Sequence, residues 1–236
     1  MLSVIIPAYN EAEKIVQTTE ELISTLDSFH ASFEIILVDD GSKDNTLEKA
    51  RCLADHHSRV KVCNYRRNRG KGYALKHGFE YTKGDPVIFL DADYDLPPHQ
   101  LGKFIENTRK NNFDILVGSK NHPLSQVKVT FCRKCLSKCY NLYVKQLFGL
   151  GVSDTQVGLK LFRRKVLEQV FPKLLLKSYA FDVELLASAK RQGYKICEAP
   201  VELNCTSNRI VIRGVWRMFW DTITTYYRMN IRHYYD

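Results

Sequence analysis

The hydrophobic positions of the first half of the chain alternate between two patterns. Short apolar, β-branched runs are typical of strands buried on both faces, and segments of helical length separate them. The predicted strands are residues 3–6, 34–38, 60–65, 87–90 and 114–117. The predicted helices are residues 11–26, 44–56, 71–81 and 98–111. This order predicts an α/β fold with a doubly wound, mostly parallel sheet.

The second half has a different pattern, in which basic and aromatic residues share long amphipathic segments. Helices are predicted over residues 125–150, 182–191 and 213–235, and strands over residues 157–162 and 196–203. No internal repeat, low-complexity segment or linker separates the two halves. We therefore expect one domain of residues 1–236, with one half at 1–120 and the other at 121–236.

Composition and charge narrow the classes of partner. Hydrophobic residues make up 44% of the chain and charged residues 26%, as in ordinary globular proteins. No apolar run approaches the length that spans a bilayer, and the first residues read as a strand rather than a signal peptide. Seven cysteines without regular spacing suit a cytoplasmic setting. The net charge of +9 favours an anionic partner, which composition alone leaves open among nucleic acid, phospholipid and phosphorylated substrate.

Acidic residues gather where the predicted strand 87–90 ends. Asp91, Asp93 and Asp95 alternate along the chain, so their side chains are expected to converge on one side. Clustered carboxylates are costly unless a cation neutralises them, and hard oxygen ligands suit Mg²⁺ or Mn²⁺. The alternative is a solvated acidic turn before the next helix. The position at the carboxyl end of a strand favours the metal site.

Two further polar segments follow predicted strands. Asp39 and Asp40 precede a glycine and a serine, which fits either a helix cap or hydrogen bonds to a nucleobase or ribose. The run Asn68-Arg69-Gly70-Lys71-Gly72 combines glycines, cations and a helix start, as in a phosphate cradle. It lacks the spacing of a P-loop, and a plain glycine-rich turn is the alternative.

Together these motifs resemble those of a known family. The motif-bearing segments are Pro7-Ala8-Tyr9-Asn10-Glu11, residues 38–44, residues 68–72, Asp91-Ala92-Asp93, and residues 154–162 with the sequence Asp-Thr-Gln-Val-Gly-Leu-Lys-Leu-Phe. In this order they resemble family 2 glycosyltransferases, specifically the polyprenyl- and dolichyl-phosphate sugar synthases. Residues 154–162 and 180–185 resemble the dolichyl-phosphate glucosyltransferase branch more than the mannose branch. The resemblance implies the glycosyltransferase A-type nucleotide-diphospho-sugar transferase fold.

The resemblance also implies roles for individual residues. The nucleotide-sugar site would comprise Pro7, Tyr9, Asn10, Glu11, Asp39, Asp40, Lys71, Asp91 and Ala92. The metal ligands would be Asp91, Asp93 and Asp95, the catalytic candidates Asp93, Asp154 and Gln156, and the acceptor-phosphate residues Lys120, Arg133 and Ser137. Lys120 stands where the family usually has arginine, so the bidentate fork of a guanidinium is lost there.

The implied reaction is inverting transfer of a hexose from a nucleotide diphosphate sugar to a polyprenyl or dolichyl phosphate, with Mg²⁺ or Mn²⁺. The product would be a β-linked lipid-phosphate sugar for glycan assembly. UDP-glucose is the favoured donor, with GDP-mannose and UDP-N-acetylglucosamine as alternatives. A sugar-nucleotide pyrophosphorylase and an inactive membrane-bound scaffold are the alternatives from other classes. No nucleic-acid partner is expected.

The last predicted helix bears on location. A polar stripe recurs every three or four residues, and aromatic and aliphatic residues fill the positions between its members. The stripe is Arg217, Asp221, Thr224, Arg228 and Arg232, and the apolar positions are Trp216, Phe219, Trp220, Ile223, Tyr227 and Ile231. This pattern, like that of residues 125–150, predicts a helix lying in the headgroup layer of an anionic membrane. The expected location is the cytoplasmic face of a membrane, with a helix docked on the protein's own core as the alternative.

Overall fold

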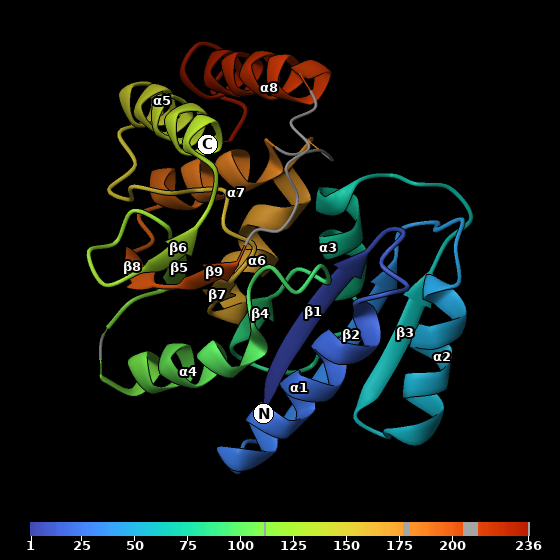
Figure 1. The fold of residues 1–236 in the computed structure, drawn as a ribbon. Helices are drawn as coiled ribbons and strands as arrows, with labels where there is room; N and C mark the ends of the chain where they lie inside the picture. The colour runs from blue at the N-terminus through green and yellow to red at the C-terminus, as the bar shows by residue number, and fades with distance from the viewer. Residues whose placement is uncertain (111, 177–179, 205–211, 236) are drawn as a thin grey trace.

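A seven-stranded sheet runs through the molecule, and both halves of the chain contribute strands to it (Figure 1). The computed structural model describes residues 1–110, 112–176, 180–204 and 212–235, without the side chains of residues 108–110, 132, 133, 212, 213 and 215. Across the sheet the strands are β3 (Val60–Asn64), β2 (Phe33–Asp39), β1 (Leu2–Ala8), β4 (Val87–Phe89), β7 (Lys160–Phe162), β5 (Ile115–Ser119) and β8 (Ile196–Pro200). Only β7 among these strands pairs antiparallel with its neighbours, which confirms the mostly parallel α/β sheet.

Helices cover both faces of this sheet. One face packs against α1 (Ile15–Ser28), α2 (Thr46–His56) and α4 (Leu101–Lys110), which follows the short turn η1 (Pro98–Gln100). The other face packs against α3 (Lys71–Phe79), α6 (Arg164–Val170), the turn η2 (Phe171–Lys173) and α7 (Phe181–Arg191). In β1, Val4 and Ile6 face the first layer and Ile5 faces the second, all three without solvent exposure. Burial on both faces explains the continuous apolar runs of the strands.

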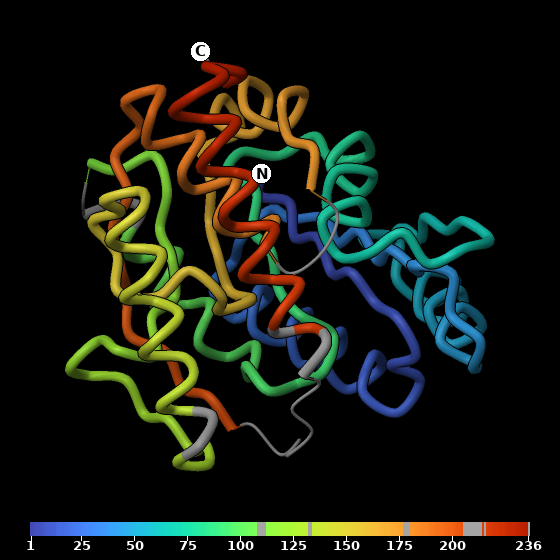
Figure 2. The backbone as a smooth tube through the Cα atoms, turned by 90° about the horizontal axis from the view of Figure 1, so that it is seen from above, coloured from blue at the N-terminus to red at the C-terminus, as the bar shows by residue number. Residues whose placement is uncertain are grey.

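Two helices form a further layer outside α7 (Figures 1 and 2). Helix α5 (Phe131–Phe148) and helix α8 (Ile212–Asn230) contact each other, and α8 also contacts α7. The hydroxyl groups of Tyr140 on α5 and Thr222 on α8 are hydrogen-bonded at 2.8 Å. The ring of Phe219 packs against Tyr140 and Tyr143 at centroid distances of 5.3 and 5.1 Å. Helix α8 is therefore docked on the core of the protein.

The outward side of α8 nonetheless carries exposed apolar side chains. They are Trp216, Trp220, Ile223 and Tyr227, spaced three or four residues apart, and Ile231 follows the end of the helix at the same spacing. Thr222 and Thr225 are fully buried because their hydroxyls donate to the carbonyl oxygens of Met218 and Asp221. The predicted division into one polar stripe and one aromatic face is therefore wrong in detail, since apolar side chains occupy both sides. No helix within the described ranges is long and apolar enough to cross a membrane.

Two predicted elements of the second half differ from the structure. Residues 125–150 are not one helix, because β6 (Gln126–Lys128) comes first and pairs with β9 (Glu202–Asn204) in a small parallel sheet. The predicted strand 196–203 is divided accordingly between β8 and β9. The Ser125 hydroxyl accepts a hydrogen bond from the backbone N–H of Val201 at 3.0 Å, which ties the two segments together. Helix α6 was not predicted.

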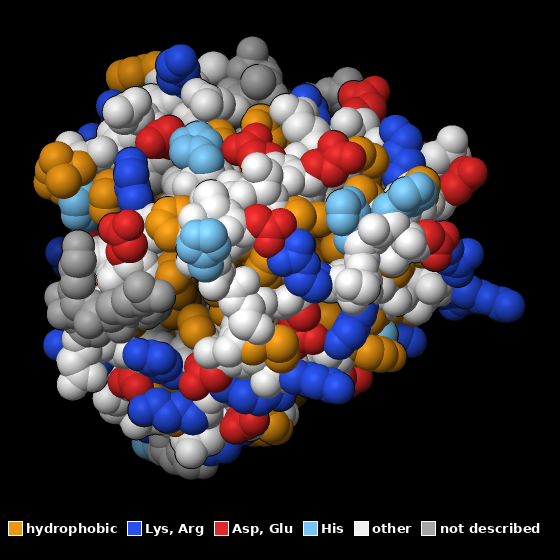
Figure 3. Space-filling view, turned by 90° about the horizontal axis from the view of Figure 1, so that it is seen from below, with side chains coloured by type: hydrophobic (Ala, Val, Ile, Leu, Met, Phe, Trp, Pro, Cys, Tyr) orange, Lys and Arg blue, Asp and Glu red, His pale blue; other side chains and the backbone are white. Residues whose placement is uncertain are grey.

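Charge is not segregated on the face seen from below. Lysine and arginine side chains alternate there with aspartate and glutamate, and hydrophobic side chains lie between them (Figure 3). Such a mixed surface provides no extended field of one sign.

Candidate active site

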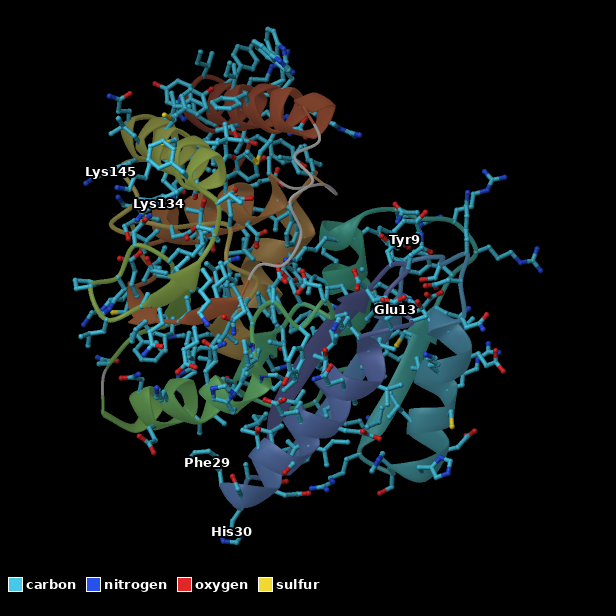
Figure 4. All side chains as sticks on the ribbon, viewed as in Figure 1. Tyr9, Glu13, Phe29, His30, Lys134 and Lys145 are labelled. Carbon is cyan, nitrogen blue, oxygen red and sulfur yellow. The ribbon has the colours of Figure 1, made fainter. Side chains whose placement is uncertain are left out.

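The loops after β1 and β2 are fastened to each other at the carboxyl edge of the sheet. The backbone N–H of Asn10 donates to the Ser42 hydroxyl at 3.0 Å, and the N–H of Lys43 donates to Asn10 Oδ1 at 2.8 Å. The N–H of Glu11 donates to Thr46 Oγ1 at 2.9 Å. Asn10 has a left-handed backbone with φ of 57°, a conformation that asparagine tolerates well. These bonds hold the half-exposed Tyr9 at this edge, where Figure 4 labels it.

Asp40 organises the glycine-rich turn. Its carboxylate accepts hydrogen bonds from the backbone N–H groups of Arg69 at 2.7 Å and Gly70 at 2.9 Å, and from the Tyr65 hydroxyl at 2.8 Å. Only 3% of Asp40 is exposed. Gly41 has φ of 70°, and a Cβ there would lie 2.7 Å from the backbone of Arg67. Asp40 thus holds the turn that carries Lys71, and its contact with a nucleobase stays a prediction.

Lys71, Asp91 and Gly158 meet at the ends of β4 and the turn before β7. Lys71 Nζ lies 2.6 Å from Asp91 Oδ1. Burial opposes the charge of Lys71, but Asp91 and Asp182 hold the pKa of this lysine above its usual value. A Cβ on Gly158 would lie 1.9 Å from Asp91 Oδ2, so only glycine leaves room for that carboxylate. The segment 154–162 thus forms one wall of the site.

A buried ion pair lies nearby. Lys160 Nζ donates to Asp182 Oδ1 at 2.7 Å and to the carbonyl oxygen of Val157 at 2.6 Å. Their side chains are 1% and 6% exposed. Burial lowers the pKa of Lys160, and the charge of Asp182 opposes that shift. Sequence reasoning assigned no role to either residue, although a lysine inside an otherwise apolar strand was a signal that it has a buried partner.

The predicted metal and acceptor residues come together in one cavity, which we call the acidic cavity. It has a volume of about 360 Å³, and its walls include Asp91, Asp93, Asp95, Lys120, Ser137 and Gln156. Asp93 retains contact with solvent, yet surrounding protein and the charges of Asp91 and Asp95 raise its pKa to about 6. Half-burial, followed by the charges of Asp93 and Asp44, raises the pKa of Glu11 to about 7. The site concentrates negative charge.

Comparison with known proteins agrees with this geometry. Residues 3–171 match the family model described as glycosyl transferase family 2. The chain belongs to glycosyltransferase family 2. The matched span contains the motif-bearing loops at the carboxyl edge of the sheet and the whole of segment 154–162.

Two named relatives are similar to this family 2 chain over most of its length. A dolichyl-phosphate beta-glucosyltransferase from Trichomonas vaginalis is 32% identical over 98% of the chain and 75% of its own length. The protein of the same name from Saccharomyces cerevisiae is 32% identical over 85% of the chain and 66% of its own length. The chain therefore spans 66–75% of the length of these two relatives.

Two solved structures have the same fold. Glucosyl-3-phosphoglycerate synthase from Mycobacterium tuberculosis, in complex with Mn²⁺, uridine diphosphate and phosphoglyceric acid, has a TM-score of 0.72 and 20% identity. The match covers 96% of this chain and 77% of that one. Mannosyl-3-phosphoglycerate synthase from Rubrobacter xylanophilus has a TM-score of 0.73 and 20% identity, over 99% and 75% of the two chains. The glycosyltransferase A-type fold is thereby confirmed.

The three carboxylates of this family 2 site do not form a three-ligand cage. Among the described residues, no group of three or more histidine, cysteine, aspartate or glutamate side chains is arranged to hold a metal ion. Asp91 is directed to Lys71, and the carboxylate of Asp93 accepts a hydrogen bond from the backbone N–H of Asp95 at 3.1 Å. The expectation that all three converge is therefore corrected: they line one cavity, but Asp91 is already charge-balanced.

Asp154 also lies elsewhere than expected in this glycosyltransferase. It is fully buried and is not part of the cavity wall, whereas Gln156 is. Its Oδ2 atom accepts from the backbone N–H of Lys120 at 3.2 Å and lies 3.3 Å from Lys120 Nζ. Asp154 thus contacts Lys120, which lines the cavity, and the prediction that Asp154 orients a sugar or acceptor stays a prediction.

The remaining predicted residues are placed as follows. Pro7 is half-buried at the end of β1, Asp39 is buried and accepts from the Ser42 N–H at 3.3 Å, and the buried Ala92 accepts from Thr18 Oγ1 at 3.0 Å. The Arg133 side chain lies outside the described part of the structure. The predicted roles of these residues toward substrate stay predictions.

Proposed function

We propose that this family 2 glycosyltransferase transfers glucose from UDP-glucose to dolichyl phosphate or another polyprenyl phosphate, with inversion at the anomeric carbon. The names of the relatives support the sugar and the acceptor. The observation that carries the proposal is the acidic cavity, where Asp93 and the pair of Lys120 and Ser137 line the same space. A donor diphosphate beside the carboxylates and an acceptor phosphate beside the lysine would thus lie next to each other.

The donor set of the cavity fits a divalent cation. Asp93 has its pKa raised by burial and by two neighbouring carboxylates, and a cation relieves that repulsion. Asp93 and one of its two neighbours, Asp91 or Asp95, would hold Mg²⁺ or Mn²⁺ through oxygen ligands. Such an ion balances the negative charge that develops on a departing diphosphate. A Mn²⁺ complex of a structural neighbour supports this assignment.

The chain's own residues would position the two substrates. Tyr9, Asn10 and Glu11, in the loop after β1, would face the nucleoside, and Lys71 places a cation next to Asp91. Lys120, Ser137 and Arg133 would hold the acceptor phosphate, where the role of Arg133 is predicted from the sequence. Gln156 lies in the wall of the same cavity. An acceptor phosphate is mostly ionised near neutral pH, so it needs no strong general base. Catalysis then rests on alignment and charge.

We further propose that residues 1–120 hold the donor while residues 121–236 present the acceptor at the cytoplasmic face of an anionic membrane. The outward apolar residues of α8 support this orientation, because tryptophan and tyrosine favour the headgroup boundary. Phe131 and Leu142 on the neighbouring helix α5 are 80% and 59% exposed. The enzyme would then be a peripheral membrane protein at that surface, with its cavity open to a lipid-borne phosphate.

A donor panel tests the reaction. The purified chain is incubated with a short polyprenyl phosphate and UDP-glucose, GDP-mannose or UDP-N-acetylglucosamine, with Mn²⁺, Mg²⁺ or excess EDTA. We expect a β-linked glucosyl lipid, seen by mass spectrometry and NMR, from UDP-glucose with metal only. Absence of lipid product from every donor would overturn the proposed reaction.

The same assay with two variants tests the metal assignment. Asp93→Asn should lose nearly all turnover because it removes the carboxylate proposed as ligand. Glu106→Gln, which makes the same change at an exposed position on α4, is the matched control and should keep full activity. Wild-type rates in Asp93→Asn, or in wild type with EDTA, would contradict metal dependence.

A further inference from the structure

A second cavity adjoins the acidic cavity and is lined by lysines. It has a volume of about 570 Å³, and Lys120, Asn121 and Lys134 line both spaces. Its other polar wall residues on α5 are Lys138, Asn141 and Lys145. We call this space the lysine pocket. It has the size of a small-molecule site.

The lysines of α5 lie on one face of the helix. Positions 134, 138, 141 and 145 are separated by three or four residues, which places them one above another. In Figure 4 the labelled Lys134 and Lys145 lie on the same side of the molecule, away from Tyr9 and Glu13. Like charges at this spacing repel each other. An anion that lies against such a face relieves this repulsion.

No acidic side chain of the described structure neutralises these lysines. Lys134, Lys138 and Lys145 have no salt bridge or side-chain hydrogen bond within the described ranges. Glu198 is the one acidic residue in the wall, and its carboxylate accepts from the backbone N–H and hydroxyl of Ser153 and from the N–H of Asp154. This carboxylate is therefore already hydrogen-bonded by its neighbours Ser153 and Asp154. The pocket keeps a net positive charge.

Asn141 provides a second, independent observation. Both polar atoms of its side chain are shielded from solvent and have no hydrogen-bond partner among the described residues. An unsatisfied buried amide is destabilising, and native structures rarely keep one without a reason. This amide belongs to a residue of the pocket wall, between Lys138 and Lys145. A ligand with acceptor oxygens can take hydrogen bonds from the Asn141 Nδ2 group and from the lysines together, and a protonated oxygen of the same ligand can donate to Asn141 Oδ1.

We propose that the lysine pocket is a second anion site, which binds a phosphate monoester group separately from the donor and acceptor of the acidic cavity. Phosphate offers several acceptor oxygens and up to two negative charges near neutral pH, which matches three ammonium groups and one amide. The group arrives either on a soluble phosphate or on the headgroup of an anionic lipid. Lys120, Asn121 and Lys134 line both cavities, so a ligand bound in one cavity contacts residues that also line the other. This site does not depend on the proposed reaction.

Calorimetry with inorganic phosphate, in the absence of metal, nucleotide and polyprenyl phosphate, tests the site. Lys138 and Lys145 line only the lysine pocket, so Lys138→Ala/Lys145→Ala changes it alone. Loss of even one charge-assisted hydrogen bond predicts a Kd raised about tenfold or more. The matched control Lys83→Ala/Lys195→Ala removes the same charge from exposed positions just before β4 and β8, at the opposite edge of the sheet. Its Kd should equal that of wild type.

Vesicle sedimentation distinguishes the two sources. Phosphatidylcholine vesicles containing phosphatidic acid present a phosphate monoester, whereas those containing phosphatidylglycerol present a diester. If the lipid is the source, wild type prefers phosphatidic acid and the Lys138→Ala/Lys145→Ala variant loses that preference. If a soluble phosphate is the source, calorimetry alone separates the variants. The proposal is overturned if wild type binds neither probe, or if the pocket variant and the control variant lose binding equally.

Discussion

Removal of the Lys160 charge should destabilise the fold strongly, although the residue touches no predicted substrate. In Lys160→Met the methylene packing is largely retained, but the Asp182 carboxylate and the Val157 carbonyl lose their common donor. Both side chains of the pair are almost fully buried, so water does not replace the ammonium group. An uncompensated buried charge is the outcome that proteins avoid most.

The expected loss in the free energy of unfolding of Lys160→Met follows from the burial of the ion pair. Breaking a buried ion pair by removing one partner costs about 3–5 kcal/mol. The lower end applies here, because the charge of Lys71 also acts on Asp182 and partly compensates it. Burial lowers the pKa of Lys160 despite the facing carboxylate, so desolvation offsets much of the attraction within the pair. The double variant Lys160→Met/Asp182→Leu should therefore cost less than either single substitution.

Urea unfolding at neutral pH with EDTA, followed by circular dichroism, measures these free energies. An unchanged m-value would show that the unfolded state is the same. Arg59→Met is the matched control, because it breaks the Arg59–Asp27 pair, whose side chains are 41% and 49% exposed, and it should change stability little. A loss below about 1 kcal/mol in Lys160→Met, or a double variant that costs more than either single substitution, would refute the reasoning.

Two further outcomes are expected. Burial and nearby carboxylates raise the pKa of Glu11 from 4.5 to about 7, so the folded protein binds this proton more tightly and loses stability as pH rises through that window. In thermal melts without metal, the Tm of Glu11→Gln should fall less between pH 4.5 and 7 than the Tm of wild type. Parallel curves of Tm against pH for the two proteins would contradict the raised pKa of Glu11. Trp216→Ser/Trp220→Ser should abolish sedimentation with anionic vesicles at low salt, whereas Tyr81→Ser, an exposed aromatic elsewhere, should not. Binding by the double variant at the wild-type level would exclude α8 as the membrane contact.

The sheet of the first half was predictable because its strands are buried on both faces. Such strands carry continuous apolar runs, and the polar loops that follow them meet at one edge whatever the details of packing. Asp91, Asp93 and Asp95 could therefore be assigned to a site from their position after β4. Strand β6 could not be predicted, because three residues carry no period and their pairing with β9 depends on a contact across 76 positions.

The partners of charged side chains could not be predicted either. The ion pairs Lys71–Asp91 and Lys160–Asp182 each join residues about twenty positions apart. Their members lie on α3, on β7, on α7 and in the loop after β4. The sequence contains many lysines and carboxylates, and only the packing selects the pairs. For the same reason the burial of Asp154 and its contact with Lys120 could not be predicted.

Helix α8 illustrates why amphipathic patterns can mislead. Its threonines satisfy their hydroxyls on the helix backbone, which lets Thr222 and Thr225 face the core. The tryptophans, which hydropathy alone would bury, remain outside. The two alternatives considered for this helix, docking on the core and facing a membrane, are thus compatible, since the first is observed on one side and the second is proposed for the other.

Helix α5 connects the features of the second half. Ser137 lines the acidic cavity, Lys138 lines the lysine pocket one residue later, and Tyr140 bonds to α8. Successive residues of a helix point about 100° apart, so one short segment reaches three different surroundings. The proposed membrane contact of α8, the proposed anion site in the lysine pocket and the predicted acceptor site therefore all adjoin one short segment of α5, residues 137–140.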